Sequence, residues 1–354
     1  MAGGIGSRFW PMSRTSFPKQ FHDVLGTGRS LIQQTFDRYL TICPKENILV
    51  VTNASYKKLV QEQLPDILED NILLEPVMRN TAPCIAYANF KIQSLNPEAN
   101  IIVAPSDHLI LKEQEFHEII NIALERASTS DSILTLGIKP SRPDTGYGYI
   151  QFDEESNFDI DPRLKTVSRF TEKPDLDNAK AFIESGDYYW NSGMFIWSLK
   201  NIQQLFQKNL PDMFGIFNDG AAKFGTPAEQ DFIDEVFPIC ENISIDYGIM
   251  EKADKVELML SDFGWSDLGT WGSLYSHIPK DENQNAIISG EIRTYDSSNN
   301  IIKLPEGKMA CVQGLDDYIV AEFNDVLLIC KKEEEQHIKT MVNELKAEGK
   351  TNRV

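Results

Sequence analysis

Cysteine and histidine are scarce in this sequence of 354 residues. The five cysteines are scattered without a C-x-x-C pair, and the five histidines show neither an H-E-x-x-H motif nor another zinc spacing. These absences argue against a transition-metal site. Most of the cysteines lie in apolar stretches, which predicts reduced, buried thiols and a cytoplasmic protein.

Positive charge and long apolar runs are scarce as well. Lysine and arginine total 34 against 53 aspartate and glutamate residues, which gives a formal net charge of -19. Such a balance argues against an extended basic surface for nucleic acid or anionic membranes. No apolar run approaches the roughly 20 residues of a membrane helix, and the N-terminus lacks the pattern of a signal peptide. The sequence predicts a soluble protein that binds neither nucleic acid nor membrane.

The first 140 residues alternate between strand-like and helix-like segments. Strand-like runs lie at 47–53, 71–76, 99–107 and 132–139, and helix-like runs at 30–40, 81–95 and 113–128. This alternation predicts an α/β fold with a Rossmann-like mixed, mainly parallel sheet covered by helices. We expect a first domain at 1–278, with an insertion from about residue 141. A small β-rich domain that ends in a helix follows at 286–354.

Three basic residues stand among the glycines of the first twenty positions: Arg8, Arg14 and Lys19. The stretch "GGIGSRFWP" is not a P-loop, because no G-K-[ST] follows, and Phe9 takes the third glycine position of a Rossmann fingerprint. Glycine lets the backbone approach phosphate closely, and the basic side chains add charge. The loop therefore predicts an anion site; a tight turn with exposed basic residues is the alternative.

A longer pattern around this loop is specific. G-G-x-G-x-R-x-W-P-x-S-R-x-x-x-P-K-Q-F resembles the signature of the sugar nucleotidyltransferases, in its mannose-1-phosphate guanylyltransferase form. Seven further blocks are similar to that family's in order: "RNTAP", "PSDH", "GYGYI", "TEKPD", "WNSGMF", "IDYGIMEK" and "WSDLGTW". The resemblance covers residues 2 to about 275. It implies that mannose 1-phosphate attacks the α-phosphorus of GTP in line and that pyrophosphate leaves.

The resemblance also implies where the nucleotide binds. Its residues would be Ala2, Gly3, Gly4, Gly6, Ser7, Asn80, Thr81 and Ser106. Arg8 and Lys19 would be catalytic, since they would neutralise charge on the triphosphate. Thr81 stands at a predicted helix start, so capping that helix is its alternative role.

The metal of such an enzyme is usually Mg²⁺, which prefers carboxylate and phosphate oxygens. Asp107 directly follows a predicted buried strand, and Asp267 lies in an apolar, aromatic setting. We expect these two residues to bind Mg²⁺. A turn or cap for Asp107, and hydrogen bonds to local amides for Asp267, are the alternatives.

The sugar phosphate would be bound within residues 141–260. By resemblance its residues are Gly146, Gly148, Glu172, Lys173, Asn191 and Asp246. A surface ion pair is the alternative for Glu172 and Lys173, and a helix cap for Asp246.

Other functions stay open from the sequence. The same chemistry could act on another nucleotide or sugar 1-phosphate, or the chain could be a catalytically silent sensor of nucleotide sugars. A glycosyltransferase would use a D-x-D motif, but the triplets 159–161 and 175–177 lie in polar stretches that predict solvated loops.

Two expectations concern the ends of the chain. Ile338, Met341, Val342 and Leu345 share one face of the last predicted helix, which either packs on its own domain or forms an interface. With the resemblance, this face predicts a homodimer. In the family a buried strand precedes the glycine-rich loop, whereas here Met1 alone precedes Ala2. We therefore expect the natural protein to begin some residues earlier.

Overall fold

The computed structural model describes residues 1–354, which divide into two compact units. Unit 1 contains Met1–Gly3, Leu40–Pro105 and Ile110–Trp265, and unit 2 contains Gly4–Tyr39, Ser106–Leu109 and Ser266–Val354. Two of the boundaries fall within the short strands β4 (Leu109–Ile110) and β10 (Trp265–Ser266). The units thus place the glycine-rich segment with the C-terminal part of the chain, so they do not follow the domain boundary expected near residue 280. That boundary stays a prediction.

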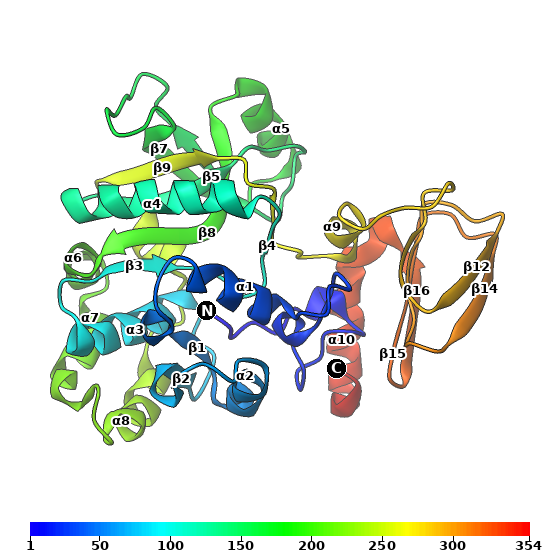
Figure 1. The fold of residues 1–354 in the computed structure, drawn as a ribbon, viewed down its shortest axis with the longest axis horizontal. Helices are drawn as coiled ribbons and strands as arrows, with labels where there is room; N and C mark the ends of the chain where they lie inside the picture. The colour runs from blue at the N-terminus through cyan, green and yellow to red at the C-terminus, as the bar shows by residue number, and fades with distance from the viewer. The chain divides into compact units, whose positions relative to one another are not determined.

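The centre of unit 1 is a six-stranded sheet (Figure 1). Its strands in spatial order are β3 (Asn100–Val103), β8 (Tyr188–Ser198), β5 (Ile133–Ile138), β9 (Val256–Ser261), β7 (Leu164–Glu172) and β6 (Gly148–Phe152). The predicted mixed α/β class is confirmed. The expectation of a mainly parallel sheet is wrong, because β5 with β9 is the only parallel pair in this sheet, whereas β8 is antiparallel to β3, β5 and β6, and β7 is antiparallel to β9 and β6. The separate pair β1 (Val50–Asn53) and β2 (Ile72–Glu75) is parallel.

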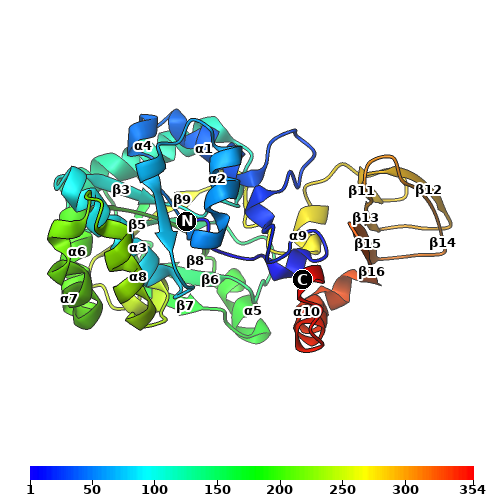
Figure 2. The ribbon, with the colours of Figure 1, turned by 90° about the horizontal axis from the view of Figure 1, so that it is seen from below.

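Helices lie on both faces of this sheet. The helices of unit 1 are α2 (Lys57–Gln63), α3 (Thr81–Leu95), α4 (Glu113–Thr129), α5 (Leu176–Ser185), α6 (Leu199–Asn209), α7 (Pro211–Asp219) and α8 (Glu229–Val236). Figure 2 shows α4 on one side of the sheet and α6 and α7 on the other. All six residues of β5 are buried, as expected of a strand that is covered on both faces. No helix of the chain has the length and apolar character that a membrane span requires.

Unit 2 contains the β-rich region and the last helix, as predicted. Its strands are β11 (Ala286–Ser289), β12 (Glu291–Tyr295), β13 (Ile301–Lys303), β14 (Met309–Gln313), β15 (Tyr318–Phe323) and β16 (Val326–Lys331). Its helices are α1 (Leu31–Leu40), whose last residue belongs to unit 1, α9 (Trp271–Tyr275) and α10 (Ile338–Ala347). Parallel ladders join β11, β13 and β15, and β12 with β14, before β16 returns antiparallel to β15.

The core of unit 2 joins the two ends of the sequence. Phe9 and Trp10 pack in one apolar cluster with Trp271 of α9 and with Ile338 and Val342 of α10. Met341 and Leu345 pack against the same cluster. The apolar face of the last helix is therefore used within its own unit, and the homodimer stays a prediction.

A buried asparagine supports the β-rich region. The side chain of Asn300 donates to Oδ1 of Asn285 and to the carbonyl of Leu315, both at 2.9 Å, and accepts from the amide of Tyr318 at 2.9 Å. Asn300 is fully buried, so these bonds have no water to replace them.

We expect Asn300→Ala to lower the free energy of unfolding by about 3 kcal/mol, because it leaves several buried polar groups without partners. Urea titration would measure the loss. Asn343→Ala, at an exposed position of α10, is the control and should change stability by less than about 0.5 kcal/mol. Equal losses in the two variants would contradict this role of Asn300.

Candidate active site

The glycine-rich loop of unit 2 is fixed through its carbonyl groups. The hydroxyl of Ser13 donates to the carbonyl of Ile5 at 2.5 Å, and the Gln20 amide donates to the carbonyl of Gly4 at 3.1 Å. Gly6 has a φ of 65°, and a Cβ at this position would lie 2.8 Å from Cβ of Lys19, so only glycine fits. The amides of Gly4, Gly6 and Ser7 have no protein acceptor. The loop therefore offers free N–H donors.

The three basic residues of this segment have different roles. Arg14 is 6% exposed and bonds to the carboxylate of Asp325 and to carbonyl groups, so it is part of the fold. Arg8 is half-buried, forms no ion pair, and its buried Nε has no hydrogen-bond partner. Of these two arginines, Arg8 is the one whose charge remains for an anion.

Lys19 is held in the interior of unit 2, with 4% of its surface exposed. Its Nζ lies 2.8 Å from Oδ2 of Asp107 and donates to the carbonyls of Asp267, at 2.7 Å, and Leu268, at 3.1 Å. The sequence predicted that Lys19 neutralises charge on the triphosphate. The structure shows its ammonium bound to the Asp107 carboxylate and to the backbone of the turn at Asp267.

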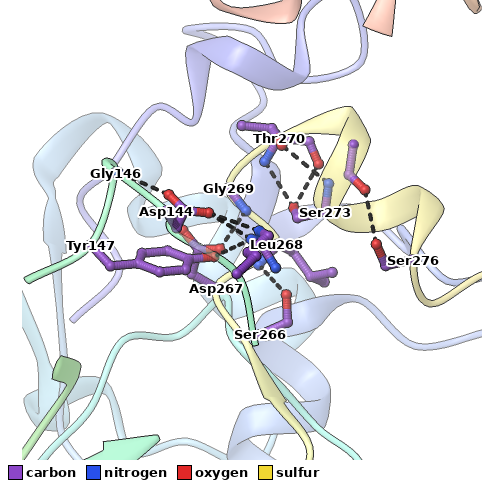
Figure 3. Close-up of polar contacts among 12 residues, drawn as sticks. Asp144, Gly146, Tyr147, Ser266, Asp267, Leu268, Gly269, Thr270, Ser273 and Ser276 are labelled. Carbon is purple, nitrogen blue, oxygen red and sulfur yellow. Dashed lines mark hydrogen bonds and ion pairs between the residues drawn. The ribbon is translucent and has the colours of Figure 1, made fainter. Parts of the chain in front are cut away.

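Asp107 and Asp267 fit a magnesium site of the kind that phosphates complete. Burial alone would raise the pKa of Asp107, but the charge of Lys19 beside it holds that pKa below its usual value, so the carboxyl is ionised. Asp267 is half-buried, and its Oδ1 accepts from the amide of Gly269 at 2.9 Å (Figure 3). No cluster of three or more His, Cys, Asp or Glu side chains occurs in the chain. Two carboxylates suffice for Mg²⁺ where substrate phosphates supply the other ligands.

The turn at Asp267 leads directly into α9. The amide of Leu268 donates to the hydroxyl of Ser266, and Thr270 and Ser273 cap α9 through reciprocal bonds (Figure 3). A Cβ at Gly269 would lie 2.3 Å from Oδ2 of Asp267. Glycine at this position therefore leaves room for the Asp267 carboxylate.

In unit 1, the structure brings Asn191 and Asp246 together. Nδ2 of Asn191 donates to Oδ1 of Asp246 at 2.8 Å, and its Oδ1 accepts from the amide of Gly193 at 3.0 Å. These bonds fix the Asn191 amide, so one N–H remains for a hydroxyl group. Burial, and after it the charge of Glu172, raises the pKa of Asp246 to about 6.

The remaining predicted sugar-site residues surround Glu172. Gly148 pairs with Glu172 across β6 and β7, and a Cβ at Gly148 would lie 2.5 Å from its Oε2. Lys173, with a φ of 47°, forms an ion pair with Glu172. The amide of Gly146 donates to Asp144 at 2.8 Å, a bond that Figure 3 also shows. Gly148, Glu172, Asn191 and Asp246 thus form one polar group, to which Lys173 is attached.

Asn80 and Thr81 are both used by the fold. The side chain of Asn80 accepts from the amide of Thr81 at 2.9 Å and caps α3. The hydroxyl of Thr81 accepts from the amide of Ile245 at 2.8 Å. The cap expected of Thr81 is thus provided by Asn80, and neither side-chain oxygen is free of protein contacts.

Sequence reasoning missed Glu75, which ends β2. It is 5% exposed, its Oε1 has no hydrogen-bond partner, and burial raises its pKa to about 7. A Cβ at Gly3 would lie 3.2 Å from its Oε2. A single glutamate at the end of a strand has no distinctive spacing, so only the position of "EP" before "RNT" could have drawn attention to it.

Two further predicted nucleotide residues, Ala2 and Gly3, lie at the start of unit 1. The amide of Ala2 donates to the carbonyl of Val51 at 2.7 Å, and the hydroxyl of Thr52 donates to the carbonyl of Ala2. The ammonium group of Met1 donates to the carbonyl of Ala104. Residues 1–3 thus lie next to the ends of β1 and β3. Gly3 is placed beside Glu75, as described above.

In unit 2, the carbonyl of Ser106, another predicted nucleotide residue, accepts from the hydroxyl of Thr35 at 3.1 Å.

The D-x-D triplets have structural roles in unit 1. Asp161 is buried and bonds to Arg163, which differs from the solvated loop that was expected, and Asp175 caps α5.

Comparisons with known proteins agree on one family. The model described as Nucleotidyl transferase matches residues 1–284, and that of the MannoseP isomerase/GMP-like beta-helix domain matches 290–345. "Mannose-1-phosphate guanylyltransferase" of Klebsiella pneumoniae is 37% identical, over 98% of this chain and 73% of that protein. The protein of that name from Salmonella muenchen is 38% identical, over 99% and 73%. A crystal structure from Thermus thermophilus, described as mannose-1-phosphate geranyltransferase, covers 98% of both chains with 28% identity and a TM-score of 0.87.

The raised pKa of Asp246 predicts a pH-dependent effect of Asp246→Asn. Aspartate has a pKa of about 4 when unfolded, so the folded wild type loses stability as pH rises from about 4 through 6, and the neutral variant does not. We expect the free energy of unfolding of the variant, relative to the wild type, to increase by about 2 kcal/mol between pH 4 and pH 8. Urea unfolding at both pH values measures this. The exposed control Asp66→Asn should show no such trend, and an equally flat result for Asp246→Asn would refute the burial argument.

Proposed function

Because the chain belongs to the nucleotidyl transferase family, we propose that it is a mannose-1-phosphate guanylyltransferase that converts GTP and mannose 1-phosphate into GDP-mannose and diphosphate. The observation that supports this most directly is that the Lys19 ammonium binds the carboxylate of Asp107 and the backbone carbonyl of Asp267, in the same unit as a loop with free amides.

The proposed chemistry is an in-line displacement at phosphorus, which depends on positioning and charge neutralisation. The amides of Gly4, Gly6 and Ser7 would bind the triphosphate, and Arg8 would stabilise charge on the departing diphosphate. Lys19 holds Asp107 ionised and fixes the turn at Asp267. Mg²⁺, which Asp107 and Asp267 would hold, supplies positive charge to the phosphates.

The sugar phosphate would use the polar group of unit 1. Glu172 and Asp246 are acceptors for sugar hydroxyls, and the remaining N–H of Asn191 is a donor. Lys173 is exposed on a backbone with positive φ, where its ammonium group can turn from Glu172 to a phosphate. Gly146 and Gly148 leave room beside these groups.

For the base we propose Glu75, together with the backbone of Ala2 and Gly3. Guanine carries two adjacent donors, N1–H and the 2-amino group, and a carboxylate offers two acceptors. The unpartnered Oε1 of Glu75 is such an acceptor. Asn80 and Thr81 then act by shaping the start of α3.

The first test is release of pyrophosphate by the purified chain with Mg²⁺, mannose 1-phosphate and each nucleoside triphosphate in turn. We expect GTP to be the best substrate and Asp107→Asn to lower kcat by about 10²–10³, the usual cost of losing a group that stabilises transition-state charge. Asp66→Asn should retain full activity. A preference for another nucleotide would remove the guanine assignment, and full activity in Asp107→Asn would remove the metal assignment.

A second test concerns base selection. Inosine triphosphate lacks the 2-amino group, so its comparison with GTP isolates one of the two proposed bonds. We expect Glu75→Gln to reduce the ratio of kcat/KM for GTP to that for inosine triphosphate by about tenfold, since a hydrogen bond to a charged group is replaced. Glu69→Gln, an exposed position just before β2, is the matched control. An unchanged ratio in Glu75→Gln would assign base selection to other groups.

A further inference from the structure

The turn between β15 and β16 contacts the segment that carries the glycine-rich loop. Both Nη atoms of Arg14 lie 3.2 Å from Oδ1 of Asp325 in this turn, and Nη2 donates to the carbonyl of Phe323 at 2.8 Å. Nη1 also donates to the carbonyl of Asn352 at 3.3 Å, and Nε donates to the carbonyl of Pro11 at 3.2 Å. All three guanidinium nitrogens are therefore engaged, and none of them is available to a phosphate.

A short path leads from this ion pair to the loop. Arg14 is followed by a tight turn in which Arg14 and Phe17 exchange backbone hydrogen bonds. It is preceded by Ser13, whose hydroxyl donates to the carbonyl of Ile5 in the loop. The chain that begins at Arg14 also carries Lys19, whose Cβ packs against Gly6. Displacing the Arg14 backbone would therefore move both groups that support the loop.

Two more contacts link the N-terminal segment to Arg353 and Arg353 to Asp325. The indole N–H of Trp10 donates to the carbonyl of Arg353 at 2.7 Å, and Nε of Arg353 lies 2.9 Å from Oδ2 of Asp325. The two oxygens of Asp325 thus bind one arginine of the N-terminal segment and one near the other end of the chain. The side chain of Asp325 is 48% exposed. It therefore contributes to the structure through these ion pairs and not through burial of its own surface.

We propose that Asp325 is a positioning residue for nucleotide binding, because it fixes Arg14 and thereby the glycine-rich loop. This inference rests on the proposed function, which gives the loop its phosphate. In this role, the β-rich region supports the nucleotide site from a distance, and no atom of Asp325 touches substrate. The test has to separate this role from a general contribution to stability.

The main variant is Asp325→Asn, which keeps the shape of the side chain and removes its charge. We expect its KM for GTP to rise about fivefold, in the range that couplings through packed contacts produce, while its KM for mannose 1-phosphate stays within twofold. In the full chain without substrates, amide hydrogen exchange of residues 9–14, whose N–H groups are hydrogen-bonded within this segment, should accelerate, whereas exchange in β5 should not change. Asp316→Asn is the matched control: Asp316 lies in another turn of the same region and bonds to Ser298 and Asn299.

A second variant, Arg14→Lys, tests the same contact from its other side, since lysine keeps the charge but loses the forked geometry. If Asp325 acts through Arg14, the double variant should have the same KM for GTP as Arg14→Lys. Equal rises of both KM values with faster exchange throughout unit 2 would show a merely structural role and overturn the proposal, as would values equal to those of Asp316→Asn. Should the unmodified chain lack activity, the proposed function fails on its own, and unchanged exchange at residues 9–14 would still overturn this inference separately.

Discussion

Lys19 brings a positive charge into the interior of unit 2, and a buried charge is tolerated only with partners. Its ammonium group is satisfied by the Asp107 carboxylate and by two carbonyls of the turn at Asp267. Segments that are about 90 and 250 positions apart in the sequence are thereby joined at one nitrogen. The same side chain leaves no space for a Cβ at Gly6. The loop conformation at Gly6 and the position of the turn at Asp267 both depend on this one side chain.

The pKa values of key acidic groups are shifted in opposite directions in the two units. In unit 2 a fixed cation lowers the pKa of Asp107, as a metal ligand requires. In unit 1, burial raises the pKa of Asp246 to about 6 and that of Glu75 to about 7. Such groups gain from donors that a ligand brings, because hydroxyl or amide N–H groups stabilise the charged form. The difference matches the roles proposed here: metal binding for Asp107, and recognition of neutral donors for Asp246 and Glu75.

Local patterns in the sequence were sufficient for most of the elements. Apolar runs predicted β5 and the helices around it. Asp107 drew attention by following a buried strand, whereas Asn191 and Glu172 were assigned from the family resemblance, and the roles of all three stay predictions. The position of β8 was not predictable in this way, because strand pairing depends on partners distant in the sequence. Glu75 was missed for a related reason: its significance comes from the absence of a partner for its Oε1 in the folded chain.

Arg14 shows most clearly why sequence position alone misleads. It stands among glycines, next to Arg8, in a segment expected to bind phosphate, yet its carboxylate partner lies 311 residues further along the chain. An arginine that is 6% exposed cannot remain without acceptors, so the β15–β16 turn is required wherever this segment adopts its fold. Arg8, which forms no ion pair, is the arginine to which we assign the ligand's charge. In that proposal, contacts that form only in the folded state give Arg14 a structural role and leave Arg8 for binding.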